Sequence, residues 1–334
     1  MRKHILIVSP ASARENNGNW QTASRWARFL RAAHRVRIAG AWSASDPAPD
    51  LMVALHARRS AAALATFGKA HPERPSVLVL TGTDLYRDIA HDPAARASLD
   101  HAAALVLLQP AGLALLPDEL RAKARVIYQS APSLRPYRRS AAPRFADIVM
   151  IGHLRAEKDP LTFIRAAALV RHPAARLLHI GGALDPALGQ AAQAAQECNP
   201  RYRWLGALPH AAARQRLKRC HAMAIASSME GGANVIIEAV TSGVPVLASD
   251  ISGNRGMLGE DYAGYFPLGD AAALARLVDR SLDDPAFDAL LRRQCAARAA
   301  LFAPSAEQAA VRDLVDNLLL AAPGATHTST GRHR

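Results

Sequence analysis

Residues 228–250 read SMEGGANVIIEAVTSGVPVLASD, and this stretch decides the expected fold. A short apolar run precedes it, AMAIAS at 222–227, and another, PVLAS, lies at 245–249. Between the two runs lies VIIEAV, which has the composition of a buried helix. Two covered strands joined by a helix form the βαβ unit of a parallel sheet. The stretch therefore predicts an α/β fold, with two glutamates and a Gly-Gly pair just after the first strand.

The same alternation of apolar runs and helical patterns extends over most of the chain. Further strands are expected at 147–152, 176–181 and 202–206, and in the first half at 4–9, 35–41, 51–55, 76–81, 104–109 and 125–130. Helices are expected at 20–34 and near 270–282, 285–301 and 304–320. Residues 131–146 hold three prolines and no apolar period, which is typical of a linker.

We therefore predict an α/β protein with two Rossmann-like, doubly wound domains that face each other across a cleft. The N-terminal domain is expected at 1–140 and the C-terminal domain at 141–321, with the last helices in the C-terminal domain. The polar residues 322–334 are expected to form a disordered tail.

Composition narrows the class of protein. The chain has 334 residues, is 50% hydrophobic and carries a formal net charge of +13. Three explanations of this positive charge are nucleic-acid binding, an origin in an arginine-rich proteome and a site for phosphorylated small molecules. The basic residues are dispersed rather than clustered, which disfavours nucleic acid. Cys198, Cys220 and Cys295 have no metal-binding or disulfide spacing, which favours a reducing compartment.

No targeting or membrane segment is expected. The N-terminal apolar run, 5–8, is shorter than the h-region of a signal peptide. The longest apolar stretch, 102–116, is interrupted by Gln109, Pro110 and Gly112 and is too short to span a bilayer. We expect a soluble, cytoplasmic protein.

Ligands of doubly wound sheets bind beyond the carboxyl ends of the strands, so the loops there hold the candidate residues. In the second half, Arg155 and Lys158 follow the first strand, and a guanidinium and an ammonium together suit a diphosphate. Glu230 follows a later strand and suits sugar hydroxyls, whereas Glu238 lies about one turn inside the following helix and suits a vicinal diol. Asn234 is expected to cap that helix, whose N–H groups suit phosphate. A solvated basic turn and a buried structural glutamate remain the simpler alternatives.

In the first half, the polar turn NNGN at 16–19 leads into a helix and can present N–H groups to an anion. LHARRS places His56 and Arg58 after the third strand, and TGTD places Thr81 and Thr83 after the fourth. An ordinary turn and a structural histidine are the alternatives for these loops.

Taken in order, GHLRAEKDP at 152–160, the turn at 205–209 and the stretch at 228–250 resemble the nucleotide-sugar glycosyltransferases of the GT-B fold, family-4-like. The resemblance covers residues 147–320 strongly and the first half more loosely. It implies an Arg-x-x-Lys diphosphate clamp, a Glu-x7-Glu donor motif and a base-reading backbone near Leu208. The aromatic residue that usually follows the first Glu-Gly is absent, which leaves the sugar open.

The stretches at 9–30, 55–61 and 80–88 also resemble the bacterial selenosugar synthases of selenoneine biosynthesis. That resemblance implies transfer of a sugar from UDP-N-acetylglucosamine or UDP-glucose to selenophosphate, with formation of a C–Se bond. The catalytic residues implied are Arg155, Lys158 and Glu230. The donor-binding residues implied are Gly18, Arg155, Lys158, Leu208, Glu230, Gly231, Gly232, Ala233, Asn234, Val235 and Glu238. The acceptor-binding residues implied are Asn17, Asn19, His56, Arg58, Thr81 and Thr83.

No Asp-x-Asp motif that would hold a bridging metal follows a strand, so we predict a metal-independent enzyme without a cofactor. The expected partners are the two small-molecule substrates, with no nucleic acid and no stable membrane association, and with room for pathway partner enzymes. The alternatives are a family-4 enzyme with a lipid or glycan acceptor at the membrane surface, a UDP-sugar epimerase of the same fold and a non-catalytic nucleic-acid binder.

Overall fold

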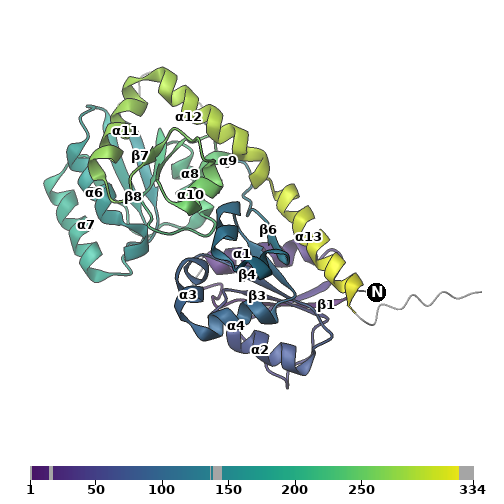
Figure 1. The fold of residues 1–334 in the computed structure, drawn as a ribbon. Coiled ribbons are helices and arrows are strands. Elements are labelled where there is room, and N and C mark those ends of the chain that lie inside the picture. The colour runs from purple at the N-terminus through teal and green to yellow at the C-terminus, as the bar shows by residue number, and fades with distance from the viewer. Residues whose placement is uncertain (1, 15–17, 136, 138–144, 323–334) are drawn as a thin grey trace, which may run out of the picture. The chain divides into compact units, whose positions relative to one another are not determined.

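The structure is a computed structural model that describes residues 2–14, 18–135, 137 and 145–322. The chain forms two compact units (Figure 1). Unit 1 consists of Met1–Tyr128 together with Ser305–Arg334, and unit 2 consists of Gln129–Pro304. Each unit is built on one six-stranded sheet whose strand pairs are all parallel.

In unit 1 the sheet order is β2-β1-β3-β4-β5-β6. Its strands are β1 His4–Val8, β2 Arg35–Ala39, β3 Leu51–Leu55, β4 Ser76–Leu80, β5 Ala104–Leu107 and β6 Ala124–Val126. Its helices are α1 Gly18–Leu30, α2 Ala61–Ala70, α3 Ile89–His91, α4 Pro93–His101, α5 Asp118–Arg121 and α13 Pro304–Ala321, with a π-helical turn η1 at Asp84–Asp88 and a 3₁₀ segment η2 at Pro110–Leu115.

The sheet of unit 1 is buried on both faces, which explains why its strands are almost wholly apolar. Successive side chains of β1 alternate between two hydrophobic clusters: Leu6 and Val8 enter one, and Ile5 and Ile7 enter the other. Helices α2 and α4 contribute to the first cluster, and α1 contributes to the second, where Trp26 is fully buried.

Helix α13 belongs to unit 1 and packs with α1, which corrects the prediction that the last helices complete the C-terminal domain (Figure 1). Val311 and Val315 enter the same cluster as Trp26. The buried Glu307 accepts a 2.6 Å hydrogen bond from Arg25 Nε and a 2.8 Å bond from Trp26 Nε1. The prediction of a helix at 304–320 is therefore confirmed, but this helix packs against α1, which lies far away in the sequence.

In unit 2 the sheet order is β12-β11-β10-β7-β8-β9. Its strands are β7 Ala146–Ile151, β8 Ala175–Ile180, β9 Tyr202–Trp204, β10 Ala222–Ile225, β11 Val246–Ser249 and β12 Tyr265–Phe266. Its helices are α6 Pro160–Leu169, α7 Pro186–Cys198, α8 His210–Leu217, α9 Asn234–Thr241, α10 Ser252–Leu258, α11 Ala271–Asp283 and α12 Pro285–Arg298, with 3₁₀ turns η3 at Ala156–Lys158 and η4 at Ala299–Phe302.

Most predicted elements agree with the structure to within a few residues, but the predicted domain limits do not. The boundary lies between residues 128 and 129 rather than 140 and 141, because the compact unit Gln129–Pro304 begins before the predicted proline-rich linker. Strand β12, with two residues, is too short to leave a pattern in the sequence. Of the predicted tail at 322–334, only Ala322 lies within the described residues, so its disorder stays a prediction.

Candidate functional site

The loops that carry the predicted donor residues meet at the switch point of the sheet in unit 2. Strand β7, the first of this unit, lies between β8 and β10; the connection after β7 leads to β8 on one side, and the connection after β10 leads to β11 on the other. The loops after β7 and β10 therefore begin side by side at the carboxyl edge of the sheet, where doubly wound folds bind ligands. Arg155 and Lys158 lie in the loop after β7, and Glu230 lies in the loop after β10.

The structure brings Lys158 and Glu230 into direct contact. Lys158 Nζ lies 2.5 Å from Glu230 Oε1, and the side chains are 18% and 9% exposed. A second tie joins the same loops, because the peptide N–H of Ser228 donates to the carbonyl of Glu157 over 2.9 Å. An ion pair that is largely shielded from water is held firmly and interacts strongly with a charged ligand.

The local backbone explains the position of Lys158. Asp159 has a left-handed conformation with φ of 43°, and its carboxylate accepts hydrogen bonds from the N–H and hydroxyl of Thr162. Pro160 begins α6, as the sequence predicts. Arg155 is exposed, and its guanidinium has no hydrogen-bond or ion-pair partner among the described residues. One cation of the predicted clamp is therefore paired and the other is free to meet a ligand.

Glu230 is supported from behind by α10. Gly253, in the first turn of that helix, lies so close that a Cβ atom there would be 2.1 Å from the carbonyl oxygen of Glu230. Only glycine allows the helix to approach the loop at this point. The position of the Glu230 backbone is thus set by contact with α10 as well as by the ion pair.

Helix α9 begins at Asn234, and this corrects the predicted cap. Its N-cap residue is Ala233, and no side chain caps the helix, because Asn234 is already its first helical residue. The N–H groups of Ala233, Asn234 and Val235 have no hydrogen-bond partner among the described residues. Such free N–H groups at the start of a helix favour an anion. Gly231 and Gly232 form the bend that leads into them.

Glu238 lies in the middle of α9 and has a partner that sequence reasoning missed. It is 8% exposed, and its Oε1 lies 2.6 Å from Nε2 of His210, the first residue of α8. The hydrogen bond to Glu238 raises the pKa of His210 above its ordinary value, against the smaller effect of burial. His210 directly follows the turn at 205–209, which the sequence analysis had already singled out, so its position next to that turn could have drawn attention to it. The peptide groups of Leu208 make no hydrogen bonds to other described residues.

In unit 1, the predicted acceptor residues of two loops meet at the carboxyl ends of β3 and β4, which are neighbours in the sheet. The fully buried carboxylate of Asp84 ties these loops together. It accepts hydrogen bonds of 2.8–2.9 Å from the N–H groups of Ala57, Thr81 and Gly82. Three peptide donors hold the ends of both strands in a fixed arrangement around one side chain.

His56 contacts Thr83 within this arrangement. Its Nε2 lies 3.2 Å from Thr83 Oγ1, and its Nδ1 accepts from the N–H of Arg59 over 3.4 Å. Burial lowers the pKa of His56 below its ordinary value, with Asp84 opposing and Arg59 adding to that effect. A neutral imidazole with its proton on Nε2 satisfies both contacts. The φ of 74° at His56 is rare for a residue with a side chain and is found most often at functional sites.

Arg58 pairs with Asp88, with 2.9 Å between Nε and Oδ2. Burial alone would raise the pKa of Asp88, but hydrogen bonds from Arg58 and Arg87 outweigh it and lower that pKa. This hydrogen bond uses only Nε of Arg58, so the other two guanidinium nitrogens take no part in it. The guanidinium of Arg59 is exposed and makes no hydrogen bond or ion pair with the described residues. Arg59 was not among the predicted site residues, but its side chain is available to a ligand.

The remaining predicted residues lie at the start of α1 and at the end of β4. Gly18 begins α1 and Asn19 follows it, whereas Asn17 lies outside the described residues. Thr81 uses its N–H on Asp84, and its hydroxyl makes no hydrogen bond to another described residue. The ligand-binding roles of these residues stay predictions.

Neither a metal cluster nor a membrane span is found in the part of the chain that the structure describes. In the described ranges, no group of three or more His, Cys, Asp or Glu is placed to hold a metal ion, and metal independence stays a prediction. No described helix combines the length and hydropathy needed to cross a bilayer.

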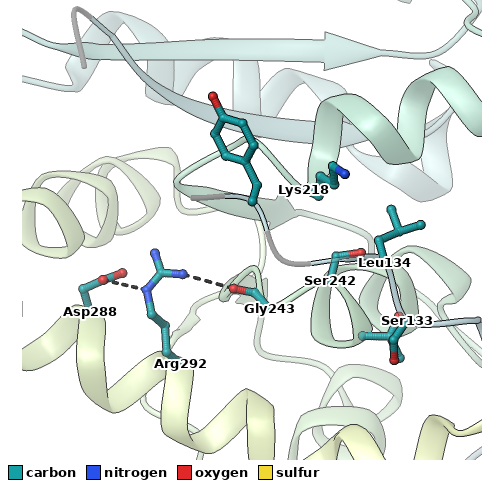
Figure 2. A pocket seen from close by; sticks show the side chains of 9 residues that line it. Ser133, Leu134, Lys218, Ser242, Gly243, Asp288 and Arg292 are labelled. Atoms are coloured by element: carbon teal, nitrogen blue, oxygen red, sulfur yellow. Dashed lines mark hydrogen bonds and ion pairs between the residues drawn. The ribbon is translucent and has the colours of Figure 1, made fainter. Parts of the chain in front are cut away.

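A pocket of about 600 Å³ in unit 2 does not coincide with the predicted donor residues (Figure 2). Thr241, Ser242 and Gly243, at the end of α9, line it, whereas the donor motif lies at the start of the same helix. Its Arg292 is engaged by Asp288 and by the carbonyl of Gly243 (Figure 2). We therefore place the candidate site at the carboxyl edge of the sheet rather than in this pocket.

Comparison with known families finds a match that lies within unit 2. Residues 139–301 match the family described as Glycosyl transferases group 1. This segment is thus similar to the glycosyl transferases of group 1. The matched segment contains Arg155, Lys158, Glu230, Glu238 and His210.

Solved structures show the same fold over nearly the whole chain. HepE from Anabaena in complex with UDP-glucose matches with a TM-score of 0.75 and 16% identity, over 95% of this chain and 100% of that chain. Sucrose-phosphate synthase from Thermosynechococcus elongatus matches with a TM-score of 0.77 and 19% identity, over 96% of this chain and 100% of that chain. A glycosyltransferase from Rickettsia africae matches with a TM-score of 0.72 and 15% identity, over 95% of this chain and 99% of that chain. The chain therefore has the GT-B fold, with two parallel-sheet Rossmann-like domains.

Proposed function

We propose that this chain transfers a sugar from a UDP-sugar to a small anionic acceptor. The observation that carries the donor half is the contact of Lys158 with Glu230 at the switch point of the sheet in unit 2. Two of the similar HepE structures hold UDP-glucose or UDP with glucose, which supports a uridine diphosphate donor here.

The chemistry follows from the charge that develops when the bond between the anomeric carbon and the diphosphate breaks. The electron pair leaves with UDP, so the leaving diphosphate gains negative charge. Lys158, the free guanidinium of Arg155 and the free N–H groups at the start of α9 stabilise that charge. Glu230 binds sugar hydroxyls, since an ionised carboxylate only accepts hydrogen bonds.

The acceptor half rests on the cluster after β3 and β4 in unit 1. If Nε2 of the neutral His56 donates to Thr83 Oγ1, the Thr83 hydroxyl proton is free to point to a ligand. The guanidinium groups of Arg58 and Arg59 are exposed beside it. One hydroxyl donor and two guanidinium groups suit a small oxyanion.

Selenophosphate is the acceptor that the sequence resemblance favours, with UDP-N-acetylglucosamine or UDP-glucose as the donor. In the proposed step, selenium donates an electron pair to the anomeric carbon, a C–Se bond forms and UDP leaves. The phosphoryl group remains on selenium until water removes it. Nothing in this step requires a general base, because selenophosphate is already an anion.

The test is a reaction of the protein with each UDP-sugar in the presence of EDTA and reductant, with and without selenophosphate generated in the same mixture. Mass spectrometry follows UDP and selenium-containing sugars. We expect UDP release that depends on selenophosphate, together with a selenosugar. Equal, slow UDP release without selenophosphate would overturn the acceptor and favour a lipid or glycan instead. Absence of binding to either UDP-sugar would overturn the donor site.

A further inference from the structure

The hydrogen bond between His210 and Glu238 joins two helices of unit 2 at the proposed donor site. Only one carboxylate oxygen of Glu238, Oε1, is engaged by His210. The other, Oε2, has no partner among the described residues. The side chain of Glu238 is 10% exposed, whereas that of His210 is 49% exposed. The imidazole therefore holds a mostly buried carboxylate from the solvent side.

The backbone before α8 fixes where the imidazole lies. Gly206 has a φ of 66°, a conformation that favours glycine, and its carbonyl accepts from the N–H of Gly181 over 2.8 Å. The N–H of Leu205 donates to His179 O over 2.8 Å. Pro209 then precedes His210 directly, and its φ of −53° is restricted by its ring. The turn is thus anchored to β8, and it delivers His210 to Glu238.

We infer that His210 is a positioning residue, which turns the carboxylate of Glu238 so that its free oxygen accepts hydrogen bonds from the ribose diol of the donor. This inference rests on the proposed function, because it takes the ligand to be a nucleoside diphosphate sugar. A carboxylate that is already held in one orientation loses less conformational entropy when the diol binds.

The protonation of His210 is consistent with this role. Nε2 carries a proton both in the imidazolium and in one neutral tautomer, so His210 can donate to Glu238 in either state. The raised pKa favours the charged donor, which makes the stronger hydrogen bond. The charged groups near the imidazole are Glu238 on α9 and Arg214 on its own helix, and these two act on its pKa in opposite directions.

The experiment measures binding of UDP and of 2′,3′-dideoxy-UDP by calorimetry to the full-length protein and its variants. For His210→Ala we expect UDP to bind roughly tenfold more weakly, since a hydrogen bond to a charged group contributes on the order of 1.5 kcal/mol or more. Binding of dideoxy-UDP, which lacks the diol, should change less than about twofold. His210→Gln should restore most of the UDP affinity, because its amide nitrogen can reach the position of Nε2.

The matched control is Gln215→Ala, an exposed residue of the same helix, which should leave both affinities unchanged. If His210 had a purely structural role, His210→Ala would weaken the binding of both nucleotides equally, and that result would overturn the inference. Unchanged UDP binding in His210→Ala would overturn it as well. If the wild-type protein binds UDP no better than dideoxy-UDP, Glu238 is not the diol ligand and the inference falls with that assignment. Failure to bind either nucleotide would instead overturn the proposed function.

Discussion

At the scale of single residues, the candidate site contains charged groups that are partly buried. Lys158 and Glu230 are mostly buried and paired, whereas Arg155 is exposed and unpaired within the described residues. A pair of this kind is more strongly coupled than a surface ion pair, because less solvent screens it. Removal of either side chain should therefore weaken ligand binding and leave the other charge partly buried without its partner.

Lys158→Ala should lower kcat for UDP release by about 10²–10³-fold, the loss typical of one donor that stabilises developing negative charge. It also leaves Glu230 without its cation. The measurement is steady-state UDP release with a saturating UDP-sugar. Lys218→Ala, a lysine of the same unit at the pocket of Figure 2, serves as the control and should retain activity. Unchanged turnover in Lys158→Ala would contradict a role of this ammonium in catalysis.

His179 should make unit 2 sensitive to acid. Burial lowers its pKa to about 4, and its contacts are Tyr202 Oη and the carbonyl of Gly152. The folded protein therefore prefers the neutral form, and stability is lost as the pH falls from the ordinary histidine value toward 4. The loss across this window is roughly 3 kcal/mol. Unfolding by urea at pH 7 and pH 4.5 should show a smaller pH effect in His179→Gln than in the wild type. His91→Gln, at an exposed position, should keep the full effect.

At the scale of elements, the short helix α10 sets the loop that carries Glu230. The contact is made by backbone rather than by side chains, because Gly253 faces the carbonyl of Glu230. The start of α9 is likewise formed by backbone, with Ala233 at the cap and no side-chain cap. The loop that carries Glu230 and the start of α9 therefore both depend on residues with little or no side chain.

Gly253→Ala should push α10 away from the loop, because its Cβ would lie 2.1 Å from Glu230 O. Overpacking of this kind typically destabilises by about 1–3 kcal/mol. We expect weaker UDP-sugar binding together with faster hydrogen exchange in residues 226–233. Gly40→Ala is the comparison, since a Cβ at Gly40 would meet no atom within 4 Å. Equal behaviour of the two variants would show that the close approach is not needed.

At the scale of the whole molecule, the chain returns to unit 1 after completing unit 2. Helix α13 fills one side of the first sheet with Val311 and Val315, and Glu307 links it to α1. The stability of unit 1 therefore depends on the last helix of the chain. A hydrophobic pattern shows that this helix has a buried face, but it does not show which sheet the face covers.

Glu307→Ala should destabilise unit 1 by about 3–5 kcal/mol, because it leaves the mostly buried Arg25 without its partner. Hydrogen exchange read by mass spectrometry should accelerate in peptides of α1 and α13, while peptides of unit 2 stay protected. Glu119→Ala, an exposed glutamate of the same unit, is the control and should change neither. Acceleration in unit 2 alone would contradict the assignment of α13 to unit 1.

Much of the candidate site could be predicted from the sequence because its residues lie at strand ends. Apolar runs locate the strands, parallel sheets align their carboxyl ends, and so Lys158 and Glu230 fall at one edge. His210 was missed because its importance depends on a contact with Glu238, 28 residues away, and no periodicity reports such a contact. The cap at Ala233 was missed because Asn234 has a strong intrinsic preference for that role, which the geometry of the loop overrides.

The sequence by itself determined the fold class, the order of most elements and the loops that carry the candidate residues, because these follow from local hydrophobic patterns and turn residues. Only the tertiary structure decided that α13 packs on unit 1, that Gly253 supports Glu230 and that Asp84 ties two strand ends together. These features depend on pairs of residues that are distant in the chain. Their energies come from packing and burial, which no single stretch of sequence contains.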